Sequence, residues 1–367
     1  MRIVQKYGGS SVADVERIRK VARRVAQRAQ EGHQLLVVVS AMGNTTNELL
    51  ALAKQLSPRP ERRELDMLLS VGERITMALL AMALRELGVP ARSFTGSQSG
   101  IITDSSHASA RVVELRPDRL LEALEAGEVV IVAGFQGMSR EREVTTLGRG
   151  GSDTTAVVLA AAIRADECEL CSDVDGVYSA DPRTVSGTVR LDEMSLDEAL
   201  ALARNGAKVL FEDAVAWAAR EGITLRASAS FSDRPGSRIV PGTPPARVIA
   251  LCRDEELGLL PLAALKSLPA PCIRHATAEG LLVDRRNLHR VIEGMEPAAT
   301  VAVVGSRAGQ DPHLLSQILD AAEAAEKPSL AWWAAADVVV FRCAPEDAAA
   351  LEQHLHRWLL SPEGSLR

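Results

Sequence analysis

The sequence has no excess of basic residues and no recognisable leader or membrane segment. Its formal net charge is −6 over 367 residues, which argues against the basic footprint of a nucleic-acid-binding protein. No window approaches the length of a membrane span, and the first residues show a strand pattern rather than a secretory signature. We therefore expect a cytoplasmic protein that contacts neither nucleic acid nor membranes.

Paired cysteines are also lacking. The five cysteines are scattered and odd in number, so a disulfide framework is not expected. Cys168 and Cys171 have the spacing C-x-x-C, but no second pair follows them. Residues three apart in a strand point to opposite faces, and we interpret these two as packing residues.

The first glycine turn lacks the familiar nucleotide-binding fingerprints. Arg2 to Lys6 predicts a strand that runs into Tyr7-Gly8-Gly9-Ser10-Ser11, and Asp14 to Ala29 has helical spacing. The turn matches neither G-x-G-x-x-G nor a Walker A loop, so neither dinucleotide binding nor a P-loop is supported. Strand, glycine turn and helix nevertheless form a unit that binds phosphate. Lys6 is then either solvated or placed to neutralise a transferring phosphoryl group.

The chain is organised around a second glycine-rich stretch, Thr146 to Ala156. It follows a strand-like run, Glu128 to Phe135, and opens an apolar helical run that extends to Ile163. Its glycines let backbone N–H groups approach an anion, and the helix N-terminus adds partial positive charge there. The glycines are Gly148, Gly150 and Gly151.

Two charged side chains in this stretch could serve a ligand. Arg149 can hold a carboxylate or phosphate with two hydrogen bonds. Asp153 would lie beside that anion, which suits a group that handles a proton, a metal or an ammonium. The alternative is a plain glycine turn with Ser152 or Asp153 as the N-cap.

Further polar turns follow apolar strand patterns. Leu35 to Ser40 is typical of a buried parallel strand and leads into a small polar turn, Ala41 to Thr46. Glu61 to Leu87 is a long helical pattern that Gly72-Glu73-Arg74 interrupts. Glu73 is either a solvated helix residue or a partner for a cationic ligand group. His107 has no nucleophile–base pattern around it and is interpreted as structural.

A polar loop follows the predicted strand Glu167 to Cys171. It contains an acid, an aromatic and an arginine, namely Asp173, Tyr178 and Arg183. The loop is either a plain turn or part of a nucleotide site, because open α/β sheets bind ligands at the carboxyl ends of their strands.

The order of predicted elements indicates two parts. Strands and helices alternate up to about residue 240, and Ser232 to Pro245 is rich in Pro, Gly and Ser, so the boundary is placed there. The tail from Val301 to Leu359 has the order βαββα of a ferredoxin-like module. Before it, strands are predicted at Val248 to Cys252 and at Gly258 to Leu262. The fold class is therefore α/β followed by α+β.

Six segments, in this order, resemble the aspartate kinases of the amino-acid kinase superfamily. They are Lys6 to Val12, Ser40 to Gly43, Thr95 to Gln98, Val132 to Gly137, Leu147 to Thr155 and Ser172 to Arg183. The resemblance runs through about residues 1–245. It implies an amino-acid kinase catalytic domain over 1–240, with a three-layer, open, mainly parallel sheet, and an ACT-like regulatory and dimerisation region over 246–367 whose first module is shortened.

The resemblance also implies an activity: transfer of the γ-phosphoryl group of ATP to the side-chain carboxylate of L-aspartate. This forms 4-phospho-L-aspartate, the first step towards lysine, threonine and methionine. Mg²⁺ would enter with ATP, held mainly by phosphates and water, and no metal site made by the protein alone is assigned. A homodimer through the ACT-like region is expected.

Site residues are carried over from the matching motifs. Lys6 would stabilise the transferring phosphoryl group and Asp153 would organise the lysine and the attacking carboxylate. Glu73 would bind the substrate ammonium and Arg149 the α-carboxylate. The further substrate contacts are Ser40, Thr46, Gly150, Gly151 and Ser152. The nucleotide contacts are Lys6, Gly8, Gly9, Ser10, Ser172, Asp173, Tyr178, Asp181, Arg183 and Lys208.

The sequence departs from the aspartate kinase pattern at two places. Phe211-Glu212-Asp213 replaces the His-Pro-Arg that many members carry after the Lys-Val-Leu run. In the second ACT-like module, the loop Gly305 to His313 has no Pro-Gly, and no effector loop is found in the first module. We therefore hypothesise that lysine and threonine feedback is lost or altered.

Two alternatives remain at the level of sequence. One is another kinase of the superfamily, acting on glutamate, N-acetylglutamate, carbamate or uridylate. The other is a non-catalytic regulatory or assembly subunit, although such a subunit would be free to lose Lys6, Glu73, Arg149 and Asp153.

Overall fold

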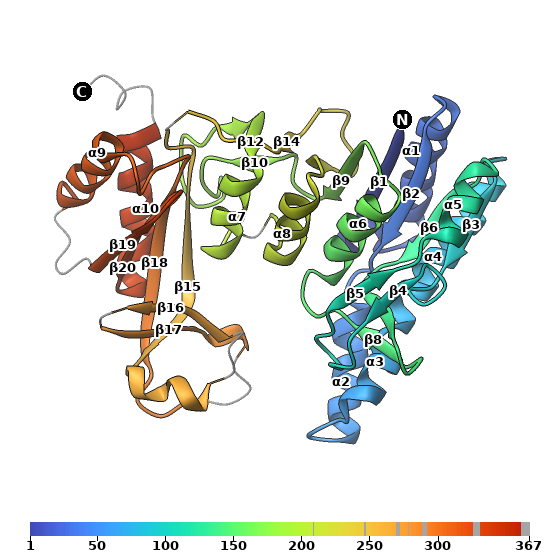
Figure 1. The fold of residues 1–367 in the computed structure, drawn as a ribbon, viewed down its shortest axis with the longest axis horizontal. Helices are drawn as coiled ribbons and strands as arrows, with labels where there is room; N and C mark the ends of the chain where they lie inside the picture. The colour runs from blue at the N-terminus through green and yellow to red at the C-terminus, as the bar shows by residue number, and fades with distance from the viewer. Residues whose placement is uncertain are drawn as a thin grey trace. The chain divides into compact units, whose positions relative to one another are not determined.

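The computed structural model describes residues 1–207, 209–245, 247–268, 272–277, 279–287, 292–325 and 331–360. Its contacts divide the chain into two units, shown as a ribbon in Figure 1. The first unit is Met1–Val177 with Asp213–Pro241, and the second is Tyr178–Glu212 with Gly242–Arg367.

The first unit is built on an open, mainly parallel sheet. Its strands are β1 (Arg2–Tyr7), β2 (Gln34–Val39), β3 (Ala91–Phe94), β6 (Val129–Ala133), β9 (Glu167–Ser172), β13 (Leu225–Ala229) and β14 (Ser237–Val240). They lie in the order β14-β13-β9-β1-β2-β6-β3. The neighbouring pairs are parallel except β13 with β14. Parallel strands are covered on both faces, and the run from Leu35 to Val39 is accordingly buried throughout.

Helices cover both faces of this sheet. On one face, α1 (Val15–Gln30) and α4 (Val71–Glu86) share a core with β1, β2 and β6. On the other, α6 (Gly151–Ala162) packs on β1, β2 and β9, and α5 (Asp118–Glu125) packs on β6 and β2 (Figure 1). Every residue from 151 to 160 is buried, as expected for a helix that is apolar all round. The predicted three-layer α/β fold is confirmed.

The first helix illustrates how local sequence sets an element. Asp14 caps α1 by accepting a hydrogen bond from the Arg17 N–H at 2.8 Å, which satisfies one of the free donors of the first turn. The buried side chains are spaced three and four apart, so one stripe faces the sheet. They are Ile18, Val21, Ala22, Val25 and Ala26.

The long helical pattern of Glu61 to Leu87 is two helices. They are α3 (Arg62–Leu69) and α4, joined at Ser70, and they follow α2 (Thr45–Leu56). Among the described residues, Arg62–Glu86 is long and apolar enough for a membrane span by length and composition alone, so the expectation that no window approaches this length was wrong. Yet Met77, Leu80 and Leu84 pack in the core of the first unit.

A second, small sheet in the first unit was not predicted. It has the order β5-β4-β7-β8, with β4 (Ile101–Thr103), β5 (Val112–Leu115), β7 (Gln136–Ser139) and β8 (Val144–Thr146). Its strands are short, so periodicity along the chain gave little signal. The unit also contains η1 (Gly9–Val12) and most of α8 (Glu212–Glu221).

The second unit has an antiparallel sheet with helices packed on it. Its strands are β15 (Ala250–Leu260), β16 (Ile273–Thr277), β17 (Gly280–Asp284), β18 (Glu296–Val304), β19 (Ala331–Ala335) and β20 (Val338–Cys343), in the order β16-β17-β15-β18-β20-β19. The helices α9 (Pro312–Glu323) and α10 (Pro345–Leu360) share a core with β18 and β20. The predicted βαββα order is therefore present.

The part of the second unit before β18 differs from the prediction. The two expected strands, Val248 to Cys252 and Gly258 to Leu262, are one strand, β15, whose register shifts between Asp254 and Leu257. Such a bulge bends a strand without ending it. Where β18 is followed by α9, β15 is followed by short turns of helix, η2 (Leu262–Ser267) and, after β17, η4 (Arg285–Asn287).

The contact division does not follow a single boundary near residue 240. The segment Tyr178–Glu212 groups with the C-terminal part of the chain and carries β11 (Arg190–Leu191), β12 (Glu193–Ser195) and α7 (Leu196–Arg204), after β10 (Val177–Tyr178). Ser179 explains the grouping: its carbonyl accepts from the Leu251 N–H at 2.7 Å, and its hydroxyl lies 2.9 Å from His356 Nε2. The predicted catalytic domain of residues 1–240 stays a prediction.

Candidate active site

Adjacent strands of the first unit end together at one edge of the sheet. The Gly8 N–H donates to the Cys171 carbonyl at 3.3 Å and the Ser40 N–H to the Tyr7 carbonyl at 3.1 Å. The Gly134 N–H continues the series by donating to the Val39 carbonyl at 3.0 Å. The loops that follow β1, β2, β6 and β9 are therefore neighbours, at the carboxyl edge where open α/β sheets bind ligands.

An ion pair lies at the centre of this edge. Lys6 Nζ is 2.9 Å from Asp153 Oδ1, and the two side chains are only 12% and 9% exposed. Lys6 is the penultimate residue of β1, and Asp153 lies in the first turn of α6. A partly buried lysine beside a carboxylate offers a fixed positive charge that an incoming phosphate can share.

Two small-residue turns touch beside this pair. The Gly43 N–H donates to the Gly9 carbonyl at 3.1 Å. A Cβ added to Gly9 would meet the Ala41 carbonyl at 3.0 Å and the Gly43 carbonyl at 3.2 Å, and a Cβ on Gly8 would lie 3.6 Å from Lys6 Nζ. The glycines thus keep the backbone of both turns open next to the ammonium group, as close phosphate approach requires.

The third turn places the start of α6 against the end of β6. Gly150 has φ +68°, a left-handed conformation that favours glycine. A Cβ on Gly134 would come within 2.7 Å of Ser152 Oγ, so the missing side chain is what lets α6 begin there. The N–H groups of this first turn and the helix dipole then face the edge that holds Lys6.

Glu73 is a buried carboxylate on the same side. The residue is 3% exposed, and Oε1 accepts from the Ala41 N–H at 3.2 Å. Oε2 is buried and has no hydrogen-bond partner among the residues that the structure describes. Burial raises the pKa of Glu73 to about 7, against the lowering effect of backbone N–H groups. A carboxylate left short of a donor in this way is suited to a cationic ligand group.

The remaining predicted residues occupy varied positions. Ser40 is half-buried directly after β2, and Thr46 is half-buried in the first turn of α2. Ser10 in η1, Arg149 before α6 and Asp173 after β9 are exposed. Ser172, at the end of β9, contacts its own loop through Val174.

Several predicted nucleotide contacts belong to the second unit. They are Tyr178, Asp181 and Arg183. Asp181 and Arg183 form a two-pronged ion pair, with Nε to Oδ1 at 2.9 Å and Nη2 to Oδ2 at 2.7 Å. Lys208 lies outside the described residues. The roles assigned to these residues stay predictions.

The prediction omitted glycines that build the site. Gly72 brings the start of α4 against the turn after β2, since a Cβ there would lie 2.6 Å from Ala41 Cβ. Gly134 makes room for Ser152. Gly134 falls within the segment Val132 to Gly137 that carried the resemblance, so its signal was available, whereas Gly72 shows only as an unexplained glycine in a helical pattern.

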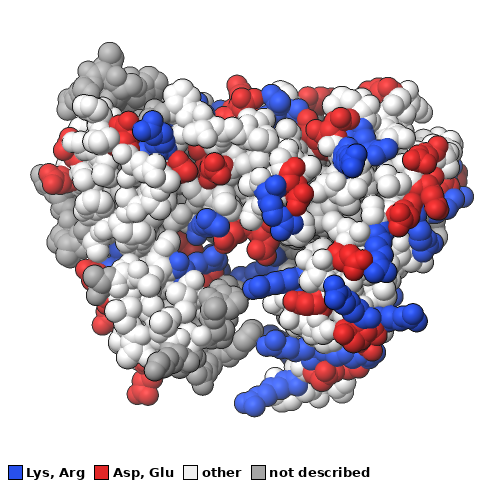
Figure 2. All heavy atoms as spheres, in the orientation of Figure 1, with Lys and Arg blue, Asp and Glu red and all other residues white. Residues whose placement is uncertain are grey.

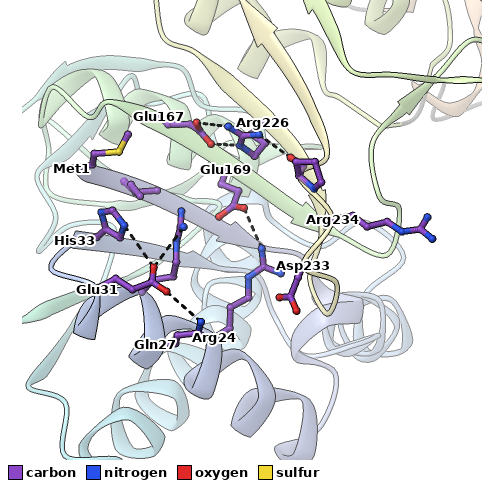
Figure 3. A pocket seen from close by; sticks show the side chains of 13 residues that line it. Met1, Arg24, Gln27, Glu31, His33, Glu167, Glu169, Arg226, Asp233 and Arg234 are labelled. Carbon is purple, nitrogen blue, oxygen red and sulfur yellow. Dashed lines mark hydrogen bonds and ion pairs between the residues drawn. The ribbon is translucent and has the colours of Figure 1, made fainter.

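A cavity lies elsewhere in the first unit. It has a volume of about 410 Å³ and is lined from the amino ends of β1, β9 and β13 (Figure 3). Its charged groups are largely paired: Arg24 Nη2 is 3.2 Å from Glu169 Oε1, and Arg226 pairs with Glu167. Because the strands are parallel, this edge is opposite to the one with Lys6. The geometry at the carboxyl edge, and not the cavity, identifies the candidate site.

Other features bear on the predictions of charge and metal. On the face in Figure 2, acidic and basic side chains are interspersed. Among the described residues, no group of three or more His, Cys, Asp or Glu side chains is placed to hold a metal. Cys168 and Cys171 are free and buried, in agreement with their interpretation as packing residues.

Sequence comparison gives one family. The profile of the Amino acid kinase family matches residues 1–226. An aspartokinase of Mycobacterium bovis is 56% identical over 239 residues, which are 65% of this chain and 57% of that protein. An aspartokinase of Corynebacterium glutamicum is 54% identical over 238 residues, 65% of this chain and 56% of that protein. The match thus spans little more than half the length of these curated relatives.

Solved structures agree with this assignment. E. coli aspartokinase III in complex with aspartate and ADP has a TM-score of 0.83 at 25% identity, and the match covers 97% of this chain and 99% of that one. Aspartate kinase from Synechocystis has a TM-score of 0.61 at 34% identity, covering 99% and 70%. The matched profile includes Lys6, Glu73 and Asp153 and extends over more than half of the residues, so the chain belongs to the amino acid kinase family.

Proposed function

We propose that this protein transfers the γ-phosphoryl group of ATP to the side-chain carboxylate of L-aspartate, forming 4-phospho-L-aspartate and ADP. The observation that carries the proposal is the Lys6–Asp153 pair at the meeting point of three glycine turns. Support comes from relatives named aspartokinase at 54 to 56% identity and from the similar E. coli enzyme in complex with aspartate and ADP.

The acceptor's charges find complementary groups. Glu73, with its unpartnered Oε2, would bind the ammonium, and Arg149 would bind the α-carboxylate in a two-pronged contact. Ser40 and Thr46 would donate hydrogen bonds, as would the start of α6 from Gly150 to Ser152. The acceptor's side-chain carboxylate would then be directed towards Lys6.

The chemistry needs alignment more than a base. A carboxylate oxygen of the acceptor attacks the γ-phosphorus, and the bond from that phosphorus to the β–γ bridging oxygen breaks, leaving ADP. The attacking group is already ionised, so no proton has to be removed. Lys6 would neutralise charge on the phosphoryl oxygens, Asp153 would orient Lys6, and Gly8, Gly9 and Ser10 would cradle the phosphates.

The other parts of the proposal rest on the resemblance. Ser172, Asp173, Tyr178, Asp181, Arg183 and Lys208 would contact the nucleotide. Mg²⁺ would be held by phosphates and water and would draw charge from the β- and γ-phosphates. The protein would act in the cytoplasm, as a homodimer through its ACT-like region, in the pathway to lysine, threonine and methionine, with lost or altered feedback.

An acceptor panel tests the reaction. Purified protein with ATP and Mg²⁺ should form hydroxylamine-trapped product with L-aspartate, and at least about a hundredfold less with glutamate or N-acetylglutamate, because a site built for specific polar groups rejects acceptors that misplace them. With carbamate and uridylate as acceptors, turnover is measured as the release of ADP. Turnover with another acceptor and not aspartate would show a different kinase, and no turnover at all would favour a binding subunit.

A further inference from the structure

A buried carboxylate outside the proposed contacts joins two segments of the first unit. Asp66 lies in α3 and is fully buried. Its Oδ2 is 2.7 Å from His107 Nδ1, both oxygens are 3.1 Å from the Ala108 N, and Oδ1 accepts from Thr146 Oγ1 at 2.5 Å. A carboxylate accepts only, so His107 Nδ1 carries the hydrogen. We call Asp66, His107 and Thr146 the Asp66 clasp.

One end of the clasp fixes the base of the loop that carries Arg149. Thr146 ends β8, three residues before Arg149. Its carbonyl accepts from the Ala110 N–H at 2.8 Å. A Cβ on Gly148 would be 3.6 Å from the Ala108 carbonyl, so the 107–110 segment lies against the glycine turn itself. The hydrogen bond from the Thr146 hydroxyl to Asp66 therefore attaches this turn to α3.

The other end of the clasp belongs to the helix pair that carries Glu73. Asp66 is in α3 and Glu73 in the first turn of α4, and only Ser70 separates the two helices. The Ser70 carbonyl accepts from Gln136 Nε2 at 2.9 Å, which holds this junction on β7. A shift of Asp66 would therefore also move Glu73.

We propose that the Asp66 clasp sets the separation between Arg149 and Glu73, and thereby selects an acceptor whose α-carboxylate and ammonium fit both. Asp66 and Thr146 are positioning residues, since neither is among the proposed acceptor contacts. The inference rests on the proposed function, because Arg149 and Glu73 are its acceptor contacts. The feature selected is the α-amino acid end of the acceptor, its α-carboxylate together with its ammonium, and the nucleotide side is unaffected.

Two adjacent threonines supply a matched test. Thr146→Val removes the hydroxyl that binds Asp66. Thr145→Val removes an equally buried hydroxyl, which lies 2.6 Å from Thr103 Oγ1 within the same small sheet. The substitutions are identical and neighbouring in sequence, but only the first breaks the clasp.

Thr146→Val should change the KM for aspartate but not the KM for ATP. Thr146→Val should raise the KM for aspartate about tenfold, the factor expected for a lost hydrogen bond to a charged group, and leave the KM for ATP unchanged. It should also narrow the preference for aspartate over succinate, which lacks the ammonium. Thr145→Val should change neither KM, even where both variants lower the Tm alike. Calorimetric titration with aspartate, without nucleotide, provides a readout apart from turnover.

Asp66→Asn gives a second arm. It keeps the shape of the side chain and should raise the KM for aspartate at least as much as Thr146→Val. Equal aspartate KM values in Thr146→Val and Thr145→Val would overturn the clasp while leaving the proposed function intact. So would a Thr146→Val enzyme whose two KM values rise together. A wild-type protein that neither binds nor phosphorylates aspartate would overturn both proposals.

Discussion

In the proposed phosphoryl transfer, Lys6 is the side chain whose loss we expect to matter most. Lys6→Met keeps the length of the side chain and removes the charge that we place on the γ-phosphate. We expect kcat to fall by at least about a hundredfold, the usual loss when one preorganised electrostatic group is removed. The same substitution at the exposed Lys54 is the control and should leave kcat unchanged. Steady-state kinetics with circular dichroism of each variant provide the measurement.

The Lys6 result has a clear contrary outcome. A folded Lys6→Met protein with more than about a tenth of wild-type kcat, a deficit of less than about 1.4 kcal/mol in the barrier, would mean that Lys6 only pairs with Asp153 and does not serve the transition state.

Glu73 should make aspartate binding depend on pH. Its pKa is raised to about 7 by burial, and only the ionised form attracts an ammonium group. Aspartate affinity should therefore rise with pH through about 7 and level off above it, with roughly a tenfold loss for each unit below. Calorimetric titration between pH 5.5 and 8.5 measures this, and Glu73→Gln should bind weakly at every pH. A pH dependence that survives in Glu73→Gln would assign it to another group.

The same carboxyl group affects stability with the opposite sign. Because the folded pKa of Glu73 lies above its ordinary value of 4.5, the folded state binds the proton more tightly than the unfolded state. The free energy of unfolding contributed by Glu73 is thus highest below about pH 4.5 and is lost as the pH rises to about 7. The free energies of unfolding of wild type and Glu73→Gln are measured by chemical denaturation at pH 5 and pH 8. Wild type should be less stable relative to Glu73→Gln at pH 8 than at pH 5.

At the scale of elements, the start of α4 depends on a glycine. Gly72→Ala would improve helix propensity by about 1 kcal/mol, but its Cβ would lie 2.6 Å from Ala41 Cβ. Neither group is a flexible side chain, and such overpacking costs about 1–3 kcal/mol. We expect net destabilisation and a higher KM for aspartate, because α4 and Glu73 are pushed away from the turn after β2.

Met82→Ala is the control for Gly72→Ala. Met82 is 65% exposed on the same helix, so its replacement should change the free energy of unfolding by less than about 0.5 kcal/mol. Urea denaturation and aspartate KM are measured on both variants. A Gly72→Ala protein as stable and as active as wild type would show that the contact with Ala41 relaxes without cost.

Most helices and strands could be predicted from the sequence, but which strands pair with one another could not. The apolar runs of β1, β2, β6 and β9 and the stripe of α1 follow from periodicity. The small sheet of β4, β5, β7 and β8 escaped prediction because its strands are three or four residues long. The single strand β15 was divided in two because the polar residues at its bulge resemble a turn.

At the scale of the whole chain, the C-terminal region that we predict to be ACT-like raises the question of feedback. The segment Gly305 to His313, which leads into the first turn of α9, lacks Pro-Gly. Its backbone is closed over neighbouring segments, since a Cβ on Gly309 would lie 2.0 Å from the Ala335 carbonyl. Asp311 caps α9 by accepting from the His313 and Leu314 N–H groups. These donors at the start of α9 are thus already engaged by the protein.

We accordingly expect weak or absent inhibition by lysine and threonine. Initial rates are measured at fixed ATP and aspartate with each amino acid alone and with both together, up to about ten millimolar, and arginine at equal concentration controls for ionic effects. A typical effector site binds with a favourable free energy of about 4 kcal/mol or more, so about ten millimolar effector would largely saturate it. We expect more than half of the activity to remain at this concentration, because such a site is lost or altered here. Strong inhibition at or below about one millimolar would contradict the hypothesis of lost or altered feedback.

The sequence by itself determined the strand–turn–helix units, the glycine turns, and the charged residues Lys6, Arg149 and Asp153 within them, because these patterns act between residues near each other in the chain. Tertiary structure alone decided the burial and raised pKa of Glu73, the close contact of Gly72 with Ala41, the Asp66 clasp, and the grouping of Tyr178–Glu212 with the second unit. Asp66 and Thr146 are 80 residues apart. No local propensity records a contact between such residues, since the packing of whole elements creates it.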